Sequence, residues 1–553
     1  MCFSSGILKG NTHPFKGVFM KEVQVSRRTF IAGLTASAGA IVVGLSACGS
    51  SKSSSDTSDS SSEQTFTGGG TINAGIAYAT SNAYTPVGVS AAAVMAAYCH
   101  CCEALYDLDY ANGNEPYAAL AAGDPVKVSD TEFTIDLRAD AKYYDGSDVT
   151  PADVKNAIEV EMANDTYKSF LSFIKEVQTT DKGVKIVLTY PAEGLLKQRL
   201  ALCRVYPAAT DQADLDKGIF PTSGPWKITS CNYDKGGTVE FEPNDQYNGS
   251  KTVKASAMHW DILNDDTTRT TYFTDKTSAA MENVPAANID LIKEAGATVE
   301  TLDSFALCFL QFNTTKAPFN DKRVRQALFY AIDIDKLISN QMAGMAKALK
   351  GFLPESFTGY HQASTVYTYD PEKAKSLLEE AGVADLKFEL MVNDRWPKDL
   401  APQIKENWDA VLGTDAVTLN VCEVQWATMN NSSEATYDVL LTPGDPSCFG
   451  KDPDLLLTWW YGDNIWTRSR TFWAESDPTK FEEMQGYLQT AREATGNAQQ
   501  EAWNKCYDLI AEEVPLYPLM HKSVSTAWWP EMLQGFEPVS TTGLYFLDAD
   551  AAK

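Results

Sequence analysis

The segment TEFTIDLRADAKYYDGSDVTPADVKNAI, residues 131–158, changes from the repeat of a β-strand to the repeat of an α-helix. Phe133, Ile135 and Leu137 alternate with polar neighbours, which is the pattern of a half-buried strand. An Asp-Gly turn follows. Thr150 can then cap a helix that has proline at its first position and Asp153 at its third. A chain that contains such strand-turn-helix units must place helices against a sheet.

Two further segments predict capped helices. In residues 320–332 an apolar stripe at helical spacing follows Asn320, which we expect to cap the helix. Asp370-Pro371 predicts the start of another helix and Gly382 its end. Strands and helices alternate along the chain without a repeat of fixed period, so a mixed α/β protein is expected. A length of 553 residues predicts two or three lobes.

The first 70 residues have the composition of an export signal followed by a flexible tether. Arg27 and Arg28 precede a diluted apolar run and resemble the twin-arginine export signal, whose cargo crosses the membrane already folded. The residues before Cys48 resemble a bacterial lipobox, in which the cysteine is lipidated. We expect residues 1–47 to be a twin-arginine lipoprotein signal peptide, and residues 48–70 to be the lipidated cysteine and a Ser/Gly-rich tether. An uncleaved anchor helix is the alternative, and both place the remaining chain outside the cytoplasm.

The charge of the chain excludes one class of partner. The net charge is −27, and without residues 1–47, which carry five basic residues and one acidic residue, it becomes −31. Nucleic-acid binding depends on clustered Lys and Arg that displace phosphate counterions, so no nucleic-acid partner is expected. A solvated acidic surface accounts for the charge.

The cysteines do not predict a disulfide scaffold or a metal centre. Nine cysteines follow Cys48, an odd and scattered set, and folding before export would keep them as thiols. The cluster Cys99-His100-Cys101-Cys102 lacks the second ligand pair of a zinc site and the C-x-x-C-H order of haem attachment. We interpret it as part of a buried apolar helix, and we expect no metal and no cofactor.

Six segments follow one another in a familiar order: LRADAKYYDGSDVTPADV (137–154), FPTSGPWKI (220–228), FEPNDQYNG (241–249), LQFNTTKAPFNDKRVRQALFYAID (310–333), YDPEKAKSLLEEAG (369–382) and CYDLIAEEVPLYPLM (506–520). Together they resemble the bacterial ABC-transporter extracellular solute-binding proteins of family 5, the peptide and nickel class. The resemblance covers nearly all of residues 71–545, and the fourth segment is its most specific part.

The resemblance implies an α/β clamshell of the periplasmic-binding-protein type, with two lobes, a hinge and a smaller inserted domain. By analogy, residues 71–98, 206–303 and 524–553 form lobe I, residues 99–205 the inserted domain, and residues 304–523 lobe II. The chain would then cross between the lobes near residues 303–307 and 522–526. Two crossings make a hinge.

The implied function is capture of a solute by hinge closure and delivery to an ABC permease, with the protein as a lipid-anchored monomer on the outer side of the cell membrane. In relatives that bind peptides, an aspartate holds the ammonium group of the ligand. Asp445 is the nearest aspartate here, but Ser447 is the residue in register, so both are candidates. The other candidate ligand contacts are Thr80, Ser81, Asn82, Trp396 and Trp426. Core burial is an equal alternative for the two tryptophans.

Several alternatives stay open at this point. The solute is predicted to be a short peptide, with nickel, haem or another non-peptide solute as the rival. A binding or sensing module without a permease would share the fold. An enzyme is not expected, because neither H-E-x-x-H nor G-x-S-x-G occurs and the histidines are isolated. The run from Trp459 to Tyr461, with Trp466, predicts either a stacked core or an aromatic-lined cleft.

Overall fold

The structure, a computed structural model of the chain, describes residues 66–80, 84–424 and 435–553. The chain divides into two units, Met1–Gln64 and Thr65–Lys553. Everything that follows concerns the second unit. The predictions for Arg27, Arg28 and Cys48 lie outside the described residues.

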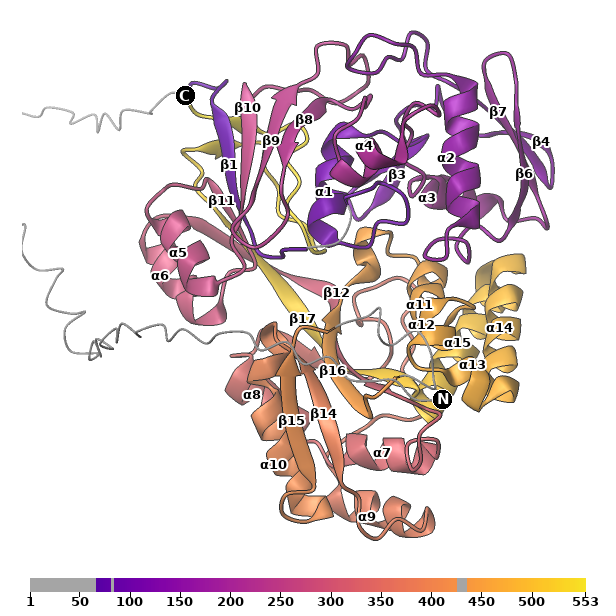
Figure 1. Ribbon diagram of the computed structural model, residues 1–553, viewed down its shortest axis with the longest axis vertical. Helices are drawn as coiled ribbons and strands as arrows, with labels where there is room; N and C mark the ends of the chain where they lie inside the picture. Colours follow the sequence, from indigo (N-terminus) through magenta and orange to yellow (C-terminus); the bar gives the residue numbers. More distant parts are fainter. Residues whose placement is uncertain (1–65, 81–83, 425–434) are drawn as a thin grey trace, which may run out of the picture. The chain divides into compact units, whose positions relative to one another are not determined.

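An eleven-stranded sheet organises this unit, in the order β15-β14-β16-β12-β17-β11-β1-β10-β9-β8, with β13 paired to β17 beside this path (Figure 1). The first strand group is β1 (Thr71–Ile76), β8 (Trp226–Cys231), β9 (Thr238–Pro243), β10 (Ala257–Ile262) and β11 (Ala280–Glu282). The second strand group is β14 (Phe388–Asn393), β15 (Val417–Cys422) and β16 (Val439–Gly444). The mixed α/β architecture predicted from the sequence is confirmed.

Two long antiparallel strands, β12 (Thr298–Phe312) and β17 (Leu516–Trp528), join the two strand groups. Figure 1 shows them running from one group to the other. Their register shifts between Leu302 and Ala306. At this point Ser304 Oγ donates to the carbonyl of Lys522, at 2.7 Å. The ladder is therefore interrupted in the middle of the sheet, where an extra residue bends a strand and leaves a local irregularity.

A separate four-stranded sheet, the small sheet, has the order β4-β5-β7-β6 and its own hydrophobic cluster. Helix α2 packs on β6 and β7. By contrast, one continuous apolar cluster contains residues of both strand groups, such as Ile72 and Leu390. The small sheet and the elements around it form what we call the small-sheet region. Its elements are β2 (Tyr106–Asp109), β3 (Glu115–Ala118), β4 (Val126–Ser129), β5 (Glu132–Asp136), α2 (Pro151–Ala163), β6 (Ile174–Thr179), β7 (Gly183–Leu188), η1 (Glu193–Leu195) and α3 (Leu196–Leu200).

The remaining elements are α1 (Ala92–Cys101), α4 (Gln212–Lys217), α5 (Asp266–Thr274), η2 (Ala286–Asn288), α6 (Ile289–Glu294), α7 (Lys322–Tyr330), α8 (Ile334–Gln341), β13 (Ala346–Ala348), α9 (Pro371–Glu380), η3 (Trp396–Asp399), α10 (Ala401–Leu412), η5 (Pro446–Cys448), α11 (Pro453–Tyr461), α12 (Ile465–Ser469), α13 (Trp473–Ser476), α14 (Pro478–Glu493), α15 (Gly496–Glu513), β18 (Leu533–Gln534) and β19 (Asp550–Ala551).

Most of the predicted helix caps are confirmed. Thr150 and Asp153 form a reciprocal capping box at the start of α2. Asp370 caps α9, and Gly382 follows that helix in the left-handed conformation, with φ of 73°. The cap predicted at Asn320 is wrong, because α7 starts one residue later and Asp321 accepts from the Arg323 amide at 2.9 Å.

Helix α1 confirms the apolar interpretation of the cysteine-histidine cluster. Its residues from Ala93 to Cys101 are all buried. His100 lies 2.6 Å from the Ala96 carbonyl through Nδ1, and its Nε2 accepts from the Phe546 amide at 2.8 Å. Burial lowers the pKa of His100 to about 4, so the ring is neutral. The nine cysteines of the described residues are free thiols.

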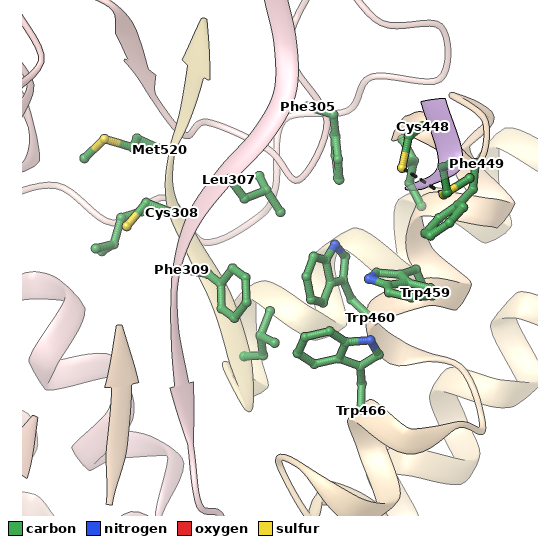
Figure 2. Close-up of a cluster of buried hydrophobic side chains, with 14 of the residues drawn as sticks. Phe305, Leu307, Cys308, Phe309, Cys448, Phe449, Trp459, Trp460, Trp466 and Met520 are labelled. Atoms are coloured by element: carbon green, nitrogen blue, oxygen red, sulfur yellow. Dashed lines mark hydrogen bonds between the residues drawn. The ribbon is translucent and has the colours of Figure 1, made fainter. Parts of the chain in front are cut away.

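The aromatic run of α11 belongs to the core. Trp459, Trp460 and Trp466 are between 2% and 7% exposed. Figure 2 shows them with Phe309 of β12 and with Phe449, and the rings of Trp460 and Trp466 are centred 4.4 Å apart. Edge-to-face contacts of this kind stabilise a core beyond the area they bury. Of the two alternatives predicted for this run, the structure shows the stacked core.

Candidate functional site

The two strand groups meet along a polar contact surface, which we call the seam. It joins segments that are far apart in the sequence and carries most of the residues predicted to bind a ligand. The seam consists of Tyr78–Thr80, Tyr110, Asn114, Glu282, Asn283, Arg395, Trp396, Asp445–Phe449, Lys522 and 540–543.

Asp445 stands at the end of β16, where it caps the short helix η5. Its Oδ1 accepts from the amide and the hydroxyl of Ser447, at 3.0 and 2.5 Å. Its Oδ2 accepts from the amide and the hydroxyl of Thr542, at 2.9 and 2.8 Å. Both carboxylate oxygens are therefore used by the chain itself.

Ser447, the rival candidate, is fully buried beside Asp445. Its hydroxyl lies 2.8 Å from Thr541 Oγ1, and its carbonyl accepts from Asn114 Nδ2 at 2.8 Å. The next carbonyl, that of Cys448, accepts from the hydroxyl of Tyr110 at 2.8 Å. The structure thus brings the two candidates together and pairs the backbone that follows β16 with side chains of residues 110–114.

Residues 541–543 connect the two sides of the seam. Thr542 donates to Asp445 on one side, while the amide of Gly543 donates to Glu282 Oε1 at 2.8 Å on the other. The second oxygen of Glu282 accepts from the Ala77 amide at 2.7 Å. Burial raises the pKa of Glu282, and these two amides oppose that shift. A short segment near the C-terminus therefore holds carboxylates from both strand groups.

A buried ion cluster fastens the small-sheet region to α11. Arg199 of α3 is fully buried and donates to Asp452 at 2.9 and 2.7 Å and to Asp454 at 2.9 Å. Arg492 also donates to Asp454, at 2.7 Å. Burial disfavours the ionised carboxyl, but the two arginines outweigh it and hold the pKa of Asp454 below its usual value. Asp454 therefore stays ionised at neutral pH.

Two cations and two aromatic rings converge at the other end of the seam. Lys522 Nζ lies 5.3 Å from the ring centre of Trp396 and donates to Asn283 Oδ1. The guanidinium of Arg395 lies 5.7 Å from the ring centre of Tyr78 and donates to the Ala79 carbonyl at 3.2 Å. Both ring contacts are within the range of cation–π attraction.

The other predicted ligand contacts have different outcomes. Thr80 is half-buried at the seam, and its amide donates to the Tyr233 carbonyl at 2.8 Å. Trp396 is half-buried and contacts the large apolar cluster with one part of its surface. Ser81, Asn82 and Trp426 lie outside the described residues. The ligand roles of all these residues stay predictions.

The seam encloses little empty space near Tyr110 and Cys448. A cavity of about 10 Å³ lies between Met95, Tyr110, Tyr167, Cys448 and Phe449, which is room for about one water molecule. Within the described residues, no three or more His, Cys, Asp or Glu side chains are arranged to hold a metal ion. The same part of the chain has no helix that is both long and apolar enough to cross a membrane.

Sequence reasoning missed several residues of the seam. Lys522 and Glu282 come from β17 and β11, and Tyr78 follows β1, so no spacing or motif links them. Outside the seam, Arg199 of the buried ion cluster was also missed, because it lies on a five-residue helix without a recognisable pattern. Arg395 directly precedes Trp396. Its position next to a candidate pocket residue was the only sequence signal that could have identified it.

Comparison with known proteins identifies the class. The family model for bacterial extracellular solute-binding proteins, family 5 (middle part), matches residues 115–470, well over half of the chain. The chain belongs to this family, whose members bind solutes outside the cytoplasm for ABC importers rather than converting them. The family prediction made from the six segments is confirmed.

Particular relatives are similar over different lengths. The glutathione-binding protein GsiB of Salmonella choleraesuis is 27% identical over 274 residues, 48% of this chain and 53% of that protein. The Escherichia coli GsiB is 24% identical over 458 residues, 78% of this chain and 85% of that protein. The chain thus spans about half the length of the first of these curated relatives.

Solved structures share the fold. A dipeptide-binding protein from a Pseudoalteromonas species, in complex with Met-Leu, is 18% identical and covers 87% of this chain and 100% of its own, with a TM-score of 0.73. NikZ from Campylobacter jejuni, in complex with Ni(L-His), is 19% identical and covers 85% and 96%, with a TM-score of 0.70. The predicted clamshell fold of the periplasmic-binding-protein type is confirmed.

Proposed function

We propose that this chain is a membrane-tethered receptor that captures a short peptide by hinge closure and passes it to an ABC permease. The observation that carries the proposal is the seam. In the seam, side chains from distant parts of the chain contact one another beside β12 and β17. Within the described residues, these are the only two strands that join the two strand groups. We place the hinge at the register shift of β12 and the adjoining residues of β17.

The lobe boundaries are part of the same proposal. Residues 71–98, 206–303 and 524–553 would move as lobe I with the inserted domain 99–205, and residues 304–523 as lobe II. A solute that touches both sides favours the closed state by its differential affinity for that state. If closure is rare without solute, a preference of about ten-thousandfold, roughly 5.5 kcal/mol, makes it dominant.

A peptide is the proposed solute because a curated relative and a solved structure are both named for binding peptides. GsiB is named for glutathione, a peptide, and the Pseudoalteromonas protein is in complex with the dipeptide Met-Leu. An extended peptide could pair with the backbone after β16 once Asn114 and Tyr110 release it. The second candidate is a nickel complex such as the one NikZ binds.

Mass spectrometry of solutes released by unfolding the natively purified protein tests the proposal. A short peptide is the expected result, and a metal complex or haem would overturn the peptide assignment. Titration calorimetry with that peptide, together with solution scattering, then tests closure. Saturating peptide should reduce the radius of gyration, and tight binding without any change in scattering would contradict the hinge mechanism.

The lipid anchor belongs to the proposal as well, and it is supported by the sequence around Cys48. A tethered receptor stays close to its permease, which raises the effective concentration of the pair. Globomycin-type inhibition of lipoprotein signal cleavage should leave the unprocessed precursor, whereas normal processing under inhibition would argue for another attachment.

A further inference from the structure

A groove outside the seam lies between helix α2, helix α4 and the residues that precede α1. Its volume is about 440 Å³, within the range of about 300 to 1,000 Å³ that small-molecule sites occupy. The lining residues all fall between Thr85 and Leu215, so none belongs to the seam and none to residues 304–523. We call this cavity the α2 groove. It lies entirely on one side of the proposed hinge.

Hydrogen bonds hold two walls of the α2 groove against the third, which is α2 itself. The Gly88 amide donates to the two oxygens of Glu161, at 3.0 and 3.1 Å. The Ala208 amide donates to Asp153 Oδ1 at 2.8 Å. A side chain at Gly88 would meet Asn164 Oδ1 at 2.4 Å, so the loop approaches α2 this closely only with glycine there. The groove is therefore built into the fold and does not depend on hinge closure.

Several polar side chains that line the groove have no partner in the chain. Tyr206 is 4% exposed, and its hydroxyl forms no hydrogen bond within the described residues. The side-chain amide of Asn156 and the hydroxyl of Thr210 also lack a partner among those residues. Burial raises the pKa of Tyr206 to about 12, so its hydroxyl is protonated at neutral pH and can donate. Because an unpaired buried hydroxyl is unfavourable, a ligand that accepts from it gains affinity.

The lining of the α2 groove carries no charge at neutral pH. Asn164 and Gln212 add two more amides, while Val87, Val160 and Leu215 supply apolar surface. None of the lining residues is Lys, Arg, His, Asp or Glu. A charged ligand would lose water here without gaining an opposite charge, and a wholly apolar ligand would leave the amides unpaired. The groove therefore suits a neutral molecule that has many hydroxyls and an apolar face of C–H groups.

We propose that the α2 groove binds a neutral saccharide, separately from the solute held in the seam. Asn156, Val160 and Asn164 line it at four-residue spacing along one face of α2. Each amide both donates and accepts, so it can pair with two neighbouring hydroxyls of a sugar ring, whose C–H face packs on Val160. Free sugars and the glycan of the cell envelope share this chemistry.

A ligand-observed NMR titration of the full chain with three disaccharides tests the proposal. Cellobiose represents a free sugar and N,N′-diacetylchitobiose a fragment of envelope glycan. Chitobiose, the cationic deacetylated form of the second probe, is the charged control. We expect a neutral disaccharide to bind, with the tighter of the two identifying the source, and chitobiose to bind about tenfold more weakly than its acetylated form.

Two results of this titration contradict the proposal. Binding of neither neutral disaccharide overturns the inference and leaves the proposed peptide receptor standing. Chitobiose that binds as tightly as its acetylated form overturns the assignment of a neutral ligand, since the charge then makes no difference.

Two variants locate the bound saccharide. Tyr206→Phe and Asn156→Ala each remove a polar group that has no partner within the described residues, so both should melt close to the parent's temperature. Each should weaken saccharide binding by about two- to tenfold, the effect of one lost hydrogen bond. Tyr507→Phe is the matched control, because Tyr507 of α15 is also fully buried with no hydroxyl partner among those residues but lies outside the groove. It should bind like the parent, and equal binding by all three variants overturns the inference.

Competition and solution scattering separate the α2 groove from the seam. Because the groove lies on one side of the hinge, saturating saccharide should leave both the radius of gyration and the affinity for Met-Leu unchanged. If the solute released from the purified protein is not a peptide, that solute replaces Met-Leu in the competition. A saccharide that the solute displaces, or that reduces the radius of gyration, binds in the seam and overturns the inference.

Discussion

Arg199→Met removes the charge that ties α3 to the start of α11 in the buried ion cluster. The substitution keeps an unbranched side chain of similar length, so the change is chiefly one of charge. It leaves Asp454, which is 3% exposed, with Arg492 as its remaining cation, and Asp452 partly open to water. Breaking a fully buried ion pair costs about 3 to 5 kcal/mol. Because Arg492 and water retain part of the compensation, we expect about 2 to 4 kcal/mol.

We expect this lost free energy to destabilise the closed arrangement of the two lobes. Without solute, the variant should have a larger radius of gyration in solution scattering than the parent, and a melting temperature lower by several degrees. Its affinity for solute should fall in proportion to the lost closed population.

Lys197→Met is the matched control on the same helix. Lys197 pairs with Asp124 at 3.1 Å, but the two side chains are 38% and 81% exposed, and such surface pairs contribute below about 1 kcal/mol. The control should leave scattering and melting almost unchanged. If Arg199→Met behaves like this control, the cluster does not hold α3 against α11 and the reasoning is refuted.

Three further results are expected. Asp445→Asn should weaken peptide binding by about ten- to a hundredfold through the lost charge-assisted bonds; if N-acetylation of the peptide weakens binding to the parent but not to this variant, Asp445 holds the ammonium, and equal losses in both exclude that role. Glu161 of α2 is buried, the Gly88 amide donates to its two oxygens at 3.0 and 3.1 Å, and burial raises its pKa from 4.5 to about 8. The stability that it contributes is therefore fully present below pH 4.5 and is lost as pH rises to about 8, so Glu161→Gln should reduce the drop in melting temperature between pH 5 and pH 8, and an unchanged drop would contradict this assignment. Cys48→Ala should release the protein from the membrane or leave its signal uncleaved, and persistent attachment of a processed chain would refute the lipid anchor.

Local sequence patterns predicted local structure well. The capping box of Thr150 and Asp153, the proline start after Asp370 and the glycine stop at Gly382 all involve residues within four positions of one another. The error at Asn320 was a shift of one residue, because Asp321 offers the same capping oxygen and accepts from the amide of Arg323. Two adjacent residues with equal capping ability cannot be separated by pattern alone.

The seam was only partly visible in the sequence. Resemblance to the family indicated Thr80, Trp396, Asp445 and Ser447 as residues of one site, and the structure brings Asp445 and Ser447 into direct contact. It did not indicate that Thr542, almost a hundred positions away, would occupy the second oxygen of Asp445. Nor could it indicate that Lys522 would lie over Trp396.

The sequence by itself determined the mixed α/β class, the start of α2, both ends of α9 and the membership in a solute-binding family, because each depends on periodicity, capping or ordered motifs that short segments carry. Only the tertiary structure decided which charges are paired. Arg199 is fully buried and Lys522 half-buried, and the first is held by two aspartates while the second contacts an amide and an aromatic ring. That difference depends on which distant segments meet across the interrupted strands β12 and β17. The electrostatic energy of a buried charge depends mainly on the few groups within several ångströms of it. The chain brings those groups together only on folding.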